Sequence, residues 1–366
     1  MQAYWLAFTQ VKGLGPVRLR HVRAQFDTIQ AAWEADDATL AHIGIPASVL
    51  QHRRLLQRQL APAQLLEAVH GLGAHVITLD DAAYPPLLKE LPDAPVVLYV
   101  KGELTPEDGQ AVALVGTRKA SSYGKLVAQN LAAELATQRL TVVSGLAHGI
   151  DAVAHRAALD AGGRTLAVLG TGIDTVYPSE HRHLAADIIR QGALVTEFAP
   201  GTRPERGNFP IRNRIISGLC LGTVVVEAPA RSGSLQTANL AAEQGREVFA
   251  VPGNINHPNS EGANRLIQDG ARLVLTADDI LSEIDIARRH TQARQTIRHV
   301  EPDSALEAQI MAFLAAEARH VDEICRACEH SVQAVNVALT MMEIKGLVYQ
   351  TAPMTYHVAQ PYNGSA

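Results

Sequence analysis

The chain lacks the features that mark secreted and membrane proteins. It has only 3 cysteines in 366 residues, and this small, odd number provides no disulfide framework and suits a reducing compartment. The first five residues carry no basic region and no long apolar core, so we predict no signal peptide. No apolar run approaches the roughly 20 residues that span a membrane. We therefore expect a cytoplasmic protein without membrane contact.

The chain also lacks an excess of basic charge. Its formal net charge is −5, and charged residues make up 19% of it. The molecule as a whole does not attract phosphate, so any nucleic-acid site must be a local patch. Hydrophobic residues reach 47%, which fits packed globular domains and argues against global disorder.

Residues 1–70 have the pattern of short helices without strands, and we predict a small helical domain there, of the helix-hairpin-helix or SAM-like kind. The turn Gly13-Leu14-Gly15 lies between two helical stretches. Such a Gly-x-Gly turn can hold a phosphate through its backbone N–H groups. A plain turn between core helices is the alternative interpretation.

Residues 72–285 have a different sequence pattern, because short β-branched runs alternate with alanine-rich helical stretches. Several runs are continuously apolar, as strands covered on both faces are. The alternation predicts an α/β fold with an extended Rossmann-like, doubly wound sheet, mixed or parallel. The strand candidates are residues 75–79, 96–100, 111–115, 140–143, 165–169, 194–196, 223–226, 247–251 and 273–275.

Residues 286–302 are polar and we interpret them as a linker, followed by a domain over residues 303–360. A capping box at Ser304–Glu307 opens a helix, and Ser331 caps a later one. Residues 347–350 and 356–358 predict a small hairpin, and this order of elements is typical of a winged helix.

The presumed recognition helix of that domain, residues 331–345, carries only Glu343 and Lys345 as charged residues. A helix that enters the major groove normally brings arginine or lysine to the phosphates and base edges. We therefore predict that the winged helix contacts protein or supports a dimer rather than binding duplex DNA.

Small, polar or glycine-rich loops follow four of the strand candidates. In a parallel sheet such loops meet at the carboxyl edge, beside helix N-termini. Glycine lets a backbone approach a ligand closely, and serine and threonine hydroxyls donate to phosphate oxygens. We predict a phosphate-binding crevice formed by Gly116, Thr117, Ser144, Gly145, Gly170, Gly172, Ser232, Gly233 and Ser234.

The dinucleotide-binding fingerprint is incomplete in these loops. It requires Gly-x-Gly-x-x-Gly after the first strand, whereas the segment from Gly170 to Thr175 has no third glycine. We therefore predict no bound NAD and no other cofactor.

Arginines gather in one short segment, where Glu205 is the only opposing charge. Arginine pairs with phosphate in a bidentate way and stacks on bases, and Phe209 offers a ring on which a nucleobase could stack. This pattern indicates single-stranded nucleic-acid binding. The alternative is that the arginines form structural ion pairs and that Phe209 belongs to the core. The cationic candidates are Arg203, Arg206, Arg212 and Arg214, with Arg118 and Arg231 on loops of the same edge.

Two other groups of residues could bind a metal ion, but their patterns favour structural roles. His148, Asp151 and His155 share one helical face, but a structural Asp151–His155 pair is more ordinary than a metal site. Cys325 and Cys328 have no second pair, so we interpret them as buried structural residues. We predict no metal.

Several segments, in the same order along the chain between Ser144 and Arg265, resemble the DNA-processing protein A (DprA/Smf) family. They are Ser144-Gly145-Leu146-Ala147-His148-Gly149-Ile150-Asp151, Tyr177-Pro178, Phe209-Pro210-Ile211-Arg212-Asn213-Arg214, Ser232-Gly233-Ser234-Leu235, Ala250-Val251-Pro252-Gly253 and Gly262-Ala263-Asn264-Arg265.

The resemblance implies an extended Rossmann-like domain that binds single-stranded DNA without base specificity and forms a homodimer through that domain. It also implies loading of the RecA recombinase during natural transformation, and it establishes no catalytic activity or cofactor. The DNA-binding positions that carry over are Arg118 and the segment from Phe209 to Arg214, including Asn213. One departure is mild, because Arg231 stands where a lysine is common and keeps the charge.

An enzyme hypothesis is retained as the alternative, because phosphate-binding crevices of this fold also occur in nucleotide hydrolases. Asp174, Glu197 and Glu227 are the acids near the predicted crevice. Their spacing alone assigns no catalytic roles. No acid follows Ser234 until Glu243, about two helical turns later.

Overall fold

The computed structural model describes residues 1–284, 304–314, 318–328, 330–344, 347–352 and 354–358. The chain divides into two compact units, Met1–Ile284 and Asp285–Ala366. The predicted linker, residues 286–302, lies outside the described residues. Among the residues that the structure describes, no helix is long and apolar enough to cross a membrane.

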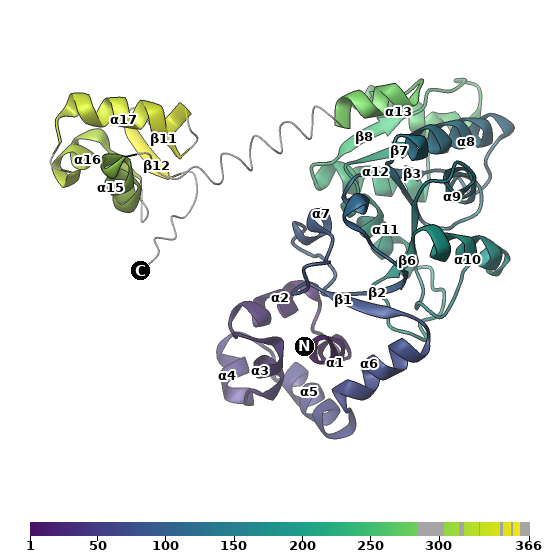
Figure 1. The fold of residues 1–366 in the computed structure, drawn as a ribbon, viewed down its shortest axis with the longest axis horizontal. Coiled ribbons are helices and arrows are strands. Elements are labelled where there is room, and N and C mark those ends of the chain that lie inside the picture. Colours follow the sequence, from purple (N-terminus) through teal and green to yellow (C-terminus); the bar gives the residue numbers. More distant parts are fainter. Residues whose placement is uncertain (285–303, 315–317, 329, 345–346, 353, 359–366) are drawn as a thin grey trace. The chain divides into compact units, whose positions relative to one another are not determined.

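A mixed sheet forms the centre of the first unit (Figure 1). Its strand order is β1-β2-β6-β5-β4-β3-β7-β8-β9. From β6 to β9 every neighbouring pair is parallel, while β1 and β2 add an antiparallel edge. Each strand candidate corresponds to a strand: β1 His75–Thr78, β2 Val97–Gly102, β3 Ala111–Val115, β4 Thr141–Ser144, β5 Thr165–Val168, β6 Ala193–Thr196, β7 Gly222–Val225, β8 Glu247–Ala250 and β9 Arg272–Leu273.

Helices cover both faces of this sheet, which confirms the Rossmann-like prediction. The α8, α9 and α10 helices lie on one side, and α11 and α12 pack together on the other (Figure 1). The strand order reverses between β3 and β7, which is the point where ligands bind in doubly wound sheets. The helices are α8 Ser122–Thr137, α9 Ile150–Asp160, α10 Arg182–Gln191, α11 Asn208–Gly218, α12 Gly233–Glu243 and α13 Glu261–Gln268, with 3-10 turns η1 Pro106–Gly109, η2 Ser179–His181 and η3 Pro258–Ser260.

Short helices form the N-terminal part of the same unit. Trp5 and Phe8 are fully buried in their core, and Thr28 caps α3 by accepting the N–H of Ala31 at 3.1 Å. The helices are α1 Gln2–Thr9, α2 Pro16–Ala24, α3 Ile29–Glu34, α4 Asp37–His42, α5 Ala47–Gln59 and α6 Pro62–Gly71, and α7 Pro86–Lys89 follows β1.

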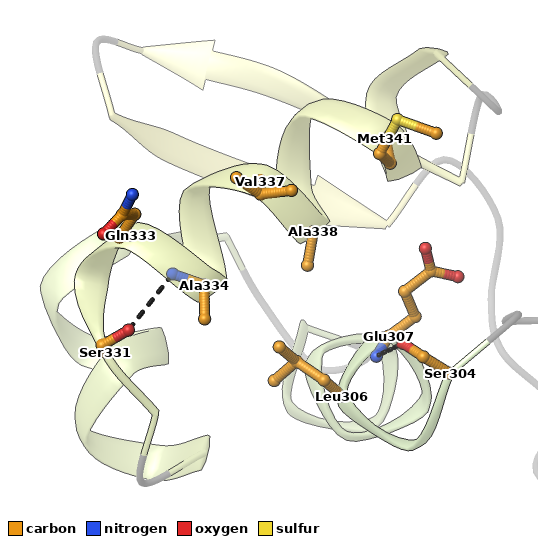
Figure 2. A pocket seen from close by; sticks show the side chains of 9 residues that line it. All are labelled: Ser304, Leu306, Glu307, Ser331, Gln333, Ala334, Val337, Ala338 and Met341. Atoms are coloured by element: carbon orange, nitrogen blue, oxygen red, sulfur yellow. Dashed lines mark hydrogen bonds between the residues drawn. The ribbon is translucent and has the colours of Figure 1, made fainter.

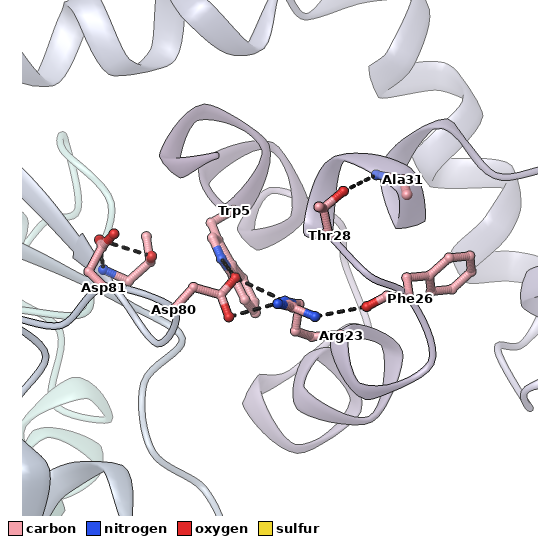
Figure 3. Close-up of polar contacts among 8 residues, drawn as sticks. Trp5, Arg23, Phe26, Thr28, Ala31, Asp80 and Asp81 are labelled. Carbon is pink, nitrogen blue, oxygen red and sulfur yellow. Dashed lines mark hydrogen bonds and ion pairs between the residues drawn. The ribbon is translucent and has the colours of Figure 1, made fainter. Parts of the chain in front are cut away.

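The carboxylate of Asp80, just after β1, attaches these helices to the sheet (Figure 3). It accepts the indole N–H of Trp5 at 3.0 Å and pairs with the Arg23 guanidinium at 2.9 Å. Two helices therefore share one acid at the end of a strand. In the turn around Gly13, the N–H of Lys12 donates to His52 Nδ1 at 3.1 Å. The phosphate role of this turn stays a prediction.

The second unit is a winged helix, as predicted. It contains α15 Ala305–Leu314, β10 Arg319–His320, α16 Val321–Cys328, α17 Val332–Ile344, β11 Val348–Ala352 and β12 Thr355–Val358, with strand order β10-β12-β11. The hydroxyls of Ser304 and Ser331 accept the N–H groups of Glu307 at 3.1 Å and Ala334 at 3.3 Å (Figure 2). Cys328 is buried in its core, whereas Cys325 is only half-buried and packs against it.

Candidate nucleic-acid interface

The predicted loops meet at one edge of the sheet. The strands β5, β4, β3 and β7 are consecutive neighbours and run parallel, so the segments after them lie side by side at their carboxyl ends. The loops that carry Arg118 and Arg231 flank the switch point between β3 and β7, and both side chains are exposed. The structure thus brings two of the predicted cations to the place where the topology favours a ligand.

An arginine and two aromatic rings form a stack at this edge. The guanidinium carbon of Arg118 lies 5.6 Å from the centroid of the Phe209 ring, within the range of a cation–π contact. The ring centroid of Tyr177 lies 5.6 Å from that of Phe209, with the planes tilted by 42°. Phe209 is half-buried, and Tyr177 is 45% exposed. We call Arg118, Phe209 and Tyr177 the stacking cluster.

The sequence predicted two members of the stacking cluster and missed the third. Tyr177 was noted only as part of a family-like Tyr-Pro pair. A tyrosine in a loop usually has no local sign that separates a surface role from a core one. Its exposure beside Phe209 is visible only in three dimensions.

Other predicted residues surround the cluster at the surface. Arg203 and Arg206 are exposed in the segment before α11. Asn213 is half-buried, and its side-chain amide donates to the Gly233 carbonyl at 3.4 Å. Ser232 caps α12, and its hydroxyl lies 2.7 Å from that of Ser234. The start of α12 is therefore connected to the middle of α11.

Arg212 and Arg214 are buried and have partners within the protein, as the alternative interpretation of structural arginines predicts. This corrects their prediction as cations that contact DNA. Arg212 is only 4% exposed, and its guanidinium donates to the Val168 carbonyl. Arg214 is 9% exposed and pairs with the carboxylates of Glu197 and Asp93. Because burial and these partners occupy both guanidinium groups, neither is presented to a phosphate in this structure.

The loop after β4 is closed in the same way. The Ser144 hydroxyl is buried and donates to the Leu114 carbonyl at 2.6 Å. Buried Asp151 accepts the N–H of Gly145 at 3.1 Å. Burial raises the pKa of the Asp151 carboxyl, and the neighbouring Arg212 guanidinium counteracts this shift. Burial likewise lowers the pKa of Arg212 to about 10. Ser144 and Gly145 thus serve internal contacts rather than an open phosphate cradle.

The loop glycines mostly make room for the protein's own atoms, which corrects the prediction that they open the backbone to a ligand. A Cβ on Gly145 would lie 2.1 Å from Arg212 Nη1, and one on Gly170 would lie 2.8 Å from a carbon of the Phe209 ring. A Cβ on Gly233, by contrast, would meet nothing within 4 Å. The same crowding by protein atoms holds for Gly116 and Gly172.

A carboxylate occupies the N-terminus of α8, where dinucleotide-binding folds hold the pyrophosphate. Glu227, 2% exposed, accepts the backbone N–H of Ser121 at 2.9 Å and also the Ser121 hydroxyl. A Cβ on Gly124 in the first turn of α8 would lie 2.3 Å from a Glu227 oxygen. The fold's usual phosphate position is therefore filled by the protein's own anion.

His155 does not form the predicted pair with Asp151. Its Nδ1 lies 2.6 Å from the Thr165 hydroxyl, and complete burial lowers its pKa to about 3. Among the described parts of the chain, no group of three or more histidine, cysteine or acidic residues is placed to hold a metal ion.

A doubly wound sheet with arginines and aromatic rings at its switch point, followed by a winged helix, defines a class of extended Rossmann-like proteins. Comparison with family models gives a match to DNA recombination-mediator protein A over residues 75–285 and to the DprA winged helix domain over residues 295–352. The chain belongs to the DprA/Smf family.

The chain is similar to curated relatives over almost its full length. It is 35% identical to Protein Smf of Synechocystis over 390 aligned residues, covering 97% of this chain and 98% of the relative. It is 42% identical to Protein Smf of Escherichia coli, covering 83% and 85%. The family's assigned role is DNA processing in recombination.

Two solved structures share the fold. The X-ray structure of DNA processing protein A from Streptococcus pneumoniae has a TM-score of 0.69 and 38% identity, covering 77% of this chain and 98% of its own. The protein from Helicobacter pylori has a TM-score of 0.52 and 28% identity, covering 59% and 96%, and its description concerns a single-stranded DNA binding mode.

Proposed function

We propose that this chain binds single-stranded DNA without base specificity along the carboxyl edge of its sheet, at the switch point. The observation that carries this proposal is the stacking cluster, in which the exposed guanidinium of Arg118 lies over Phe209 beside exposed Tyr177. Aromatic rings accept any base, and arginine attracts the backbone, which is the usual basis of sequence-blind single-strand binding. The similarity to the Helicobacter pylori protein supports the same ligand.

The DNA contacts that we propose follow exposure rather than the full sequence-based set. Arg118, Arg206 and Arg231 supply charge to phosphates, and Phe209 stacks on a base. The open backbone around Gly233 and the hydroxyl of Ser232 lie beside them at the start of α12. Arg212 and Arg214 are buried and are not among the proposed DNA contacts.

In the cell, this binding would protect incoming strands and deliver them to the RecA recombinase during natural transformation. We propose that the protein works as a homodimer through the Rossmann-like domain, because two linked crevices raise avidity for a long strand without new contacts. Exposed apolar residues in and directly after the edge strand β9, Leu273 and Leu275, offer a surface for that dimer.

We propose that the role is binding rather than catalysis and requires no cofactor. The three acids near the crevice are all engaged: Asp174 accepts the Gly201 N–H at 2.9 Å, Glu197 pairs with Arg214, and Glu227 accepts from Ser121. An acid that is already paired is a poor general base. A turnover assay with nucleoside monophosphates checks this directly, and measurable release of the base would contradict it.

For the winged helix we propose a protein-contact role. A pocket of about 510 Å³ lies between α15 and α17 (Figure 2). On α17 it is lined by Ala334, Val337 and Met341, and the last two are 61% and 46% exposed. An apolar stripe with helical spacing is typical of protein contacts rather than of phosphate contacts.

Fluorescence anisotropy tests the main proposal with labelled poly-dT, a mixed-sequence single strand and the matched duplex. We expect similar, tight binding to both single strands and weaker binding to the duplex. Equal affinity for the duplex would contradict the proposal, because stacking on Phe209 and Tyr177 requires unpaired bases.

A further inference from the structure

A buried arginine and a buried aspartate influence each other electrostatically, and the arginine lies on the same helix as Phe209. Arg212 on α11 is 4% exposed and Asp151 on α9 is 6% exposed. The Arg212 guanidinium donates to the carbonyl of Val168 at the end of β5, and Asp151 accepts the N–H groups of Gly145 and Ala147 after β4, at 3.1 and 3.3 Å. Arg212 therefore connects α11 to the end of β5, and Asp151 connects α9 to the loop after β4.

The Arg212 guanidinium packs directly against Gly145. A Cβ at this position would lie 2.1 Å from Arg212 Nη1 and 2.6 Å from the guanidinium carbon. Only a residue without a side chain admits the flat guanidinium group there. Lysine, with a compact and strongly hydrated ammonium, would keep the charge but could not occupy the same planar space.

Phe209 lies one helical turn before Arg212, so the two side chains occupy the same side of α11. The Phe209 ring is seated on Gly170, in the loop that follows β5, where a Cβ would lie 2.8 Å from the ring. The guanidinium carbon of Arg118 lies 5.6 Å from the centroid of the ring. Two residues of one helix are thus inserted against glycines of two adjacent loops.

We propose that Arg212, held between the Val168 carbonyl and Gly145, is a positioning residue that fixes the Phe209 ring for base stacking and makes no phosphate contact itself. This inference rests on the proposed single-strand binding. It gives the Ser144–Asp151 motif a structural role. It also gives Arg212 a different role from the exposed arginines, which contact phosphates.

The test compares Arg212→Lys with Arg118→Ala in poly-dT anisotropy titrations over a series of salt concentrations. Arg212→Lys is expected to weaken binding by up to about 150-fold, the upper end of the range that base stacking supplies, without changing the log–log salt slope. Arg118→Ala, the matched control at the surface, is expected to reduce the slope by about 0.7. A comparable reduction of the slope by Arg212→Lys would overturn the proposal, since it would indicate a lost phosphate contact.

A double-mutant cycle with Phe209→Ala isolates the positioning effect. If Arg212 acts through Phe209, Arg212→Lys causes no further loss in the Phe209→Ala background. Fully additive losses overturn the positioning role and leave single-strand binding intact. If Phe209→Ala alone binds as tightly as the wild type, the stacking proposal itself fails and the positioning role fails with it.

Gly145→Ala is a second variant that separates a loss of positioning from a loss of folding. It retains both buried charges and displaces only the guanidinium, so it is expected to reproduce the loss of affinity at unchanged salt slope. Each variant is measured at a temperature where its circular dichroism spectrum matches that of the wild type. Wild-type affinity in folded Gly145→Ala overturns the proposal.

Discussion

Replacing Arg118 by alanine tests most directly whether the exposed arginines, rather than the buried ones, contact the phosphates of DNA. The side chain is exposed at the switch point and covers Phe209 at 5.6 Å. The variant loses one charge-assisted phosphate contact of about 1.5–3 kcal/mol, weakened by solvent. We expect a net loss of about 1–2 kcal/mol in binding free energy, or roughly 5- to 30-fold in affinity.

The assay is poly-dT anisotropy at several salt concentrations, with a thermal melt of the same protein as the folding control. The melting temperature should stay close to that of the wild type, because an exposed side chain contributes little to stability. The salt slope should fall by about 0.7. An unchanged slope, or a loss confined to one base sequence, would refute the reasoning, since the former excludes a phosphate contact and the latter implies base readout.

Three further predictions concern buried residues. Arg214→Ala leaves Glu197 uncompensated in a poorly exposed site, so we expect a loss of about 3 kcal/mol in the free energy of unfolding by urea titration; a change below about 0.5 kcal/mol would contradict the buried pair. Gly170→Ala pushes on the Phe209 ring from 2.8 Å and should weaken poly-dT binding at constant salt slope, whereas wild-type binding would show that the ring tolerates displacement. Buried His155 has a pKa of about 3 in the folded protein, below the usual value near 6.5. The unfolded chain therefore binds the extra proton between these values, and stability should be complete above about pH 6.5 and decline towards pH 3. His155→Leu should flatten this decline, and an unaltered pH dependence would argue against a buried neutral imidazole.

The fold was largely predictable, because its signals are local and mutually consistent. Largely apolar runs such as 111–115 and 165–169 predict strands covered on both faces, and every residue of β3 and β5 is buried. Capping residues such as Ser304 and Ser331 marked helix starts that the structure contains. Turn and cap chemistry acts over a few residues, which is the range that a single sequence reveals.

The site was only partly predictable, because charge and glycine content do not reveal burial. Arg118 and Arg212 look equivalent in the sequence, yet one is exposed and the other is only 4% exposed. The glycine at position 145 makes room for a side chain more than 60 residues away in the chain, Arg212. Such contacts depend on which strands become neighbours, and no local pattern encodes them.

Cross-linking of a single strand that contains 5-iodouracil, followed by peptide mapping, tests the central claim most directly. The reagent reports aromatic residues that lie against an unpaired base. We predict cross-links to peptides that contain Phe209 or Tyr177, both in the stacking cluster at the switch point. Cross-links confined to the winged helix or to residues 1–70 would place the single strand elsewhere and contradict the account.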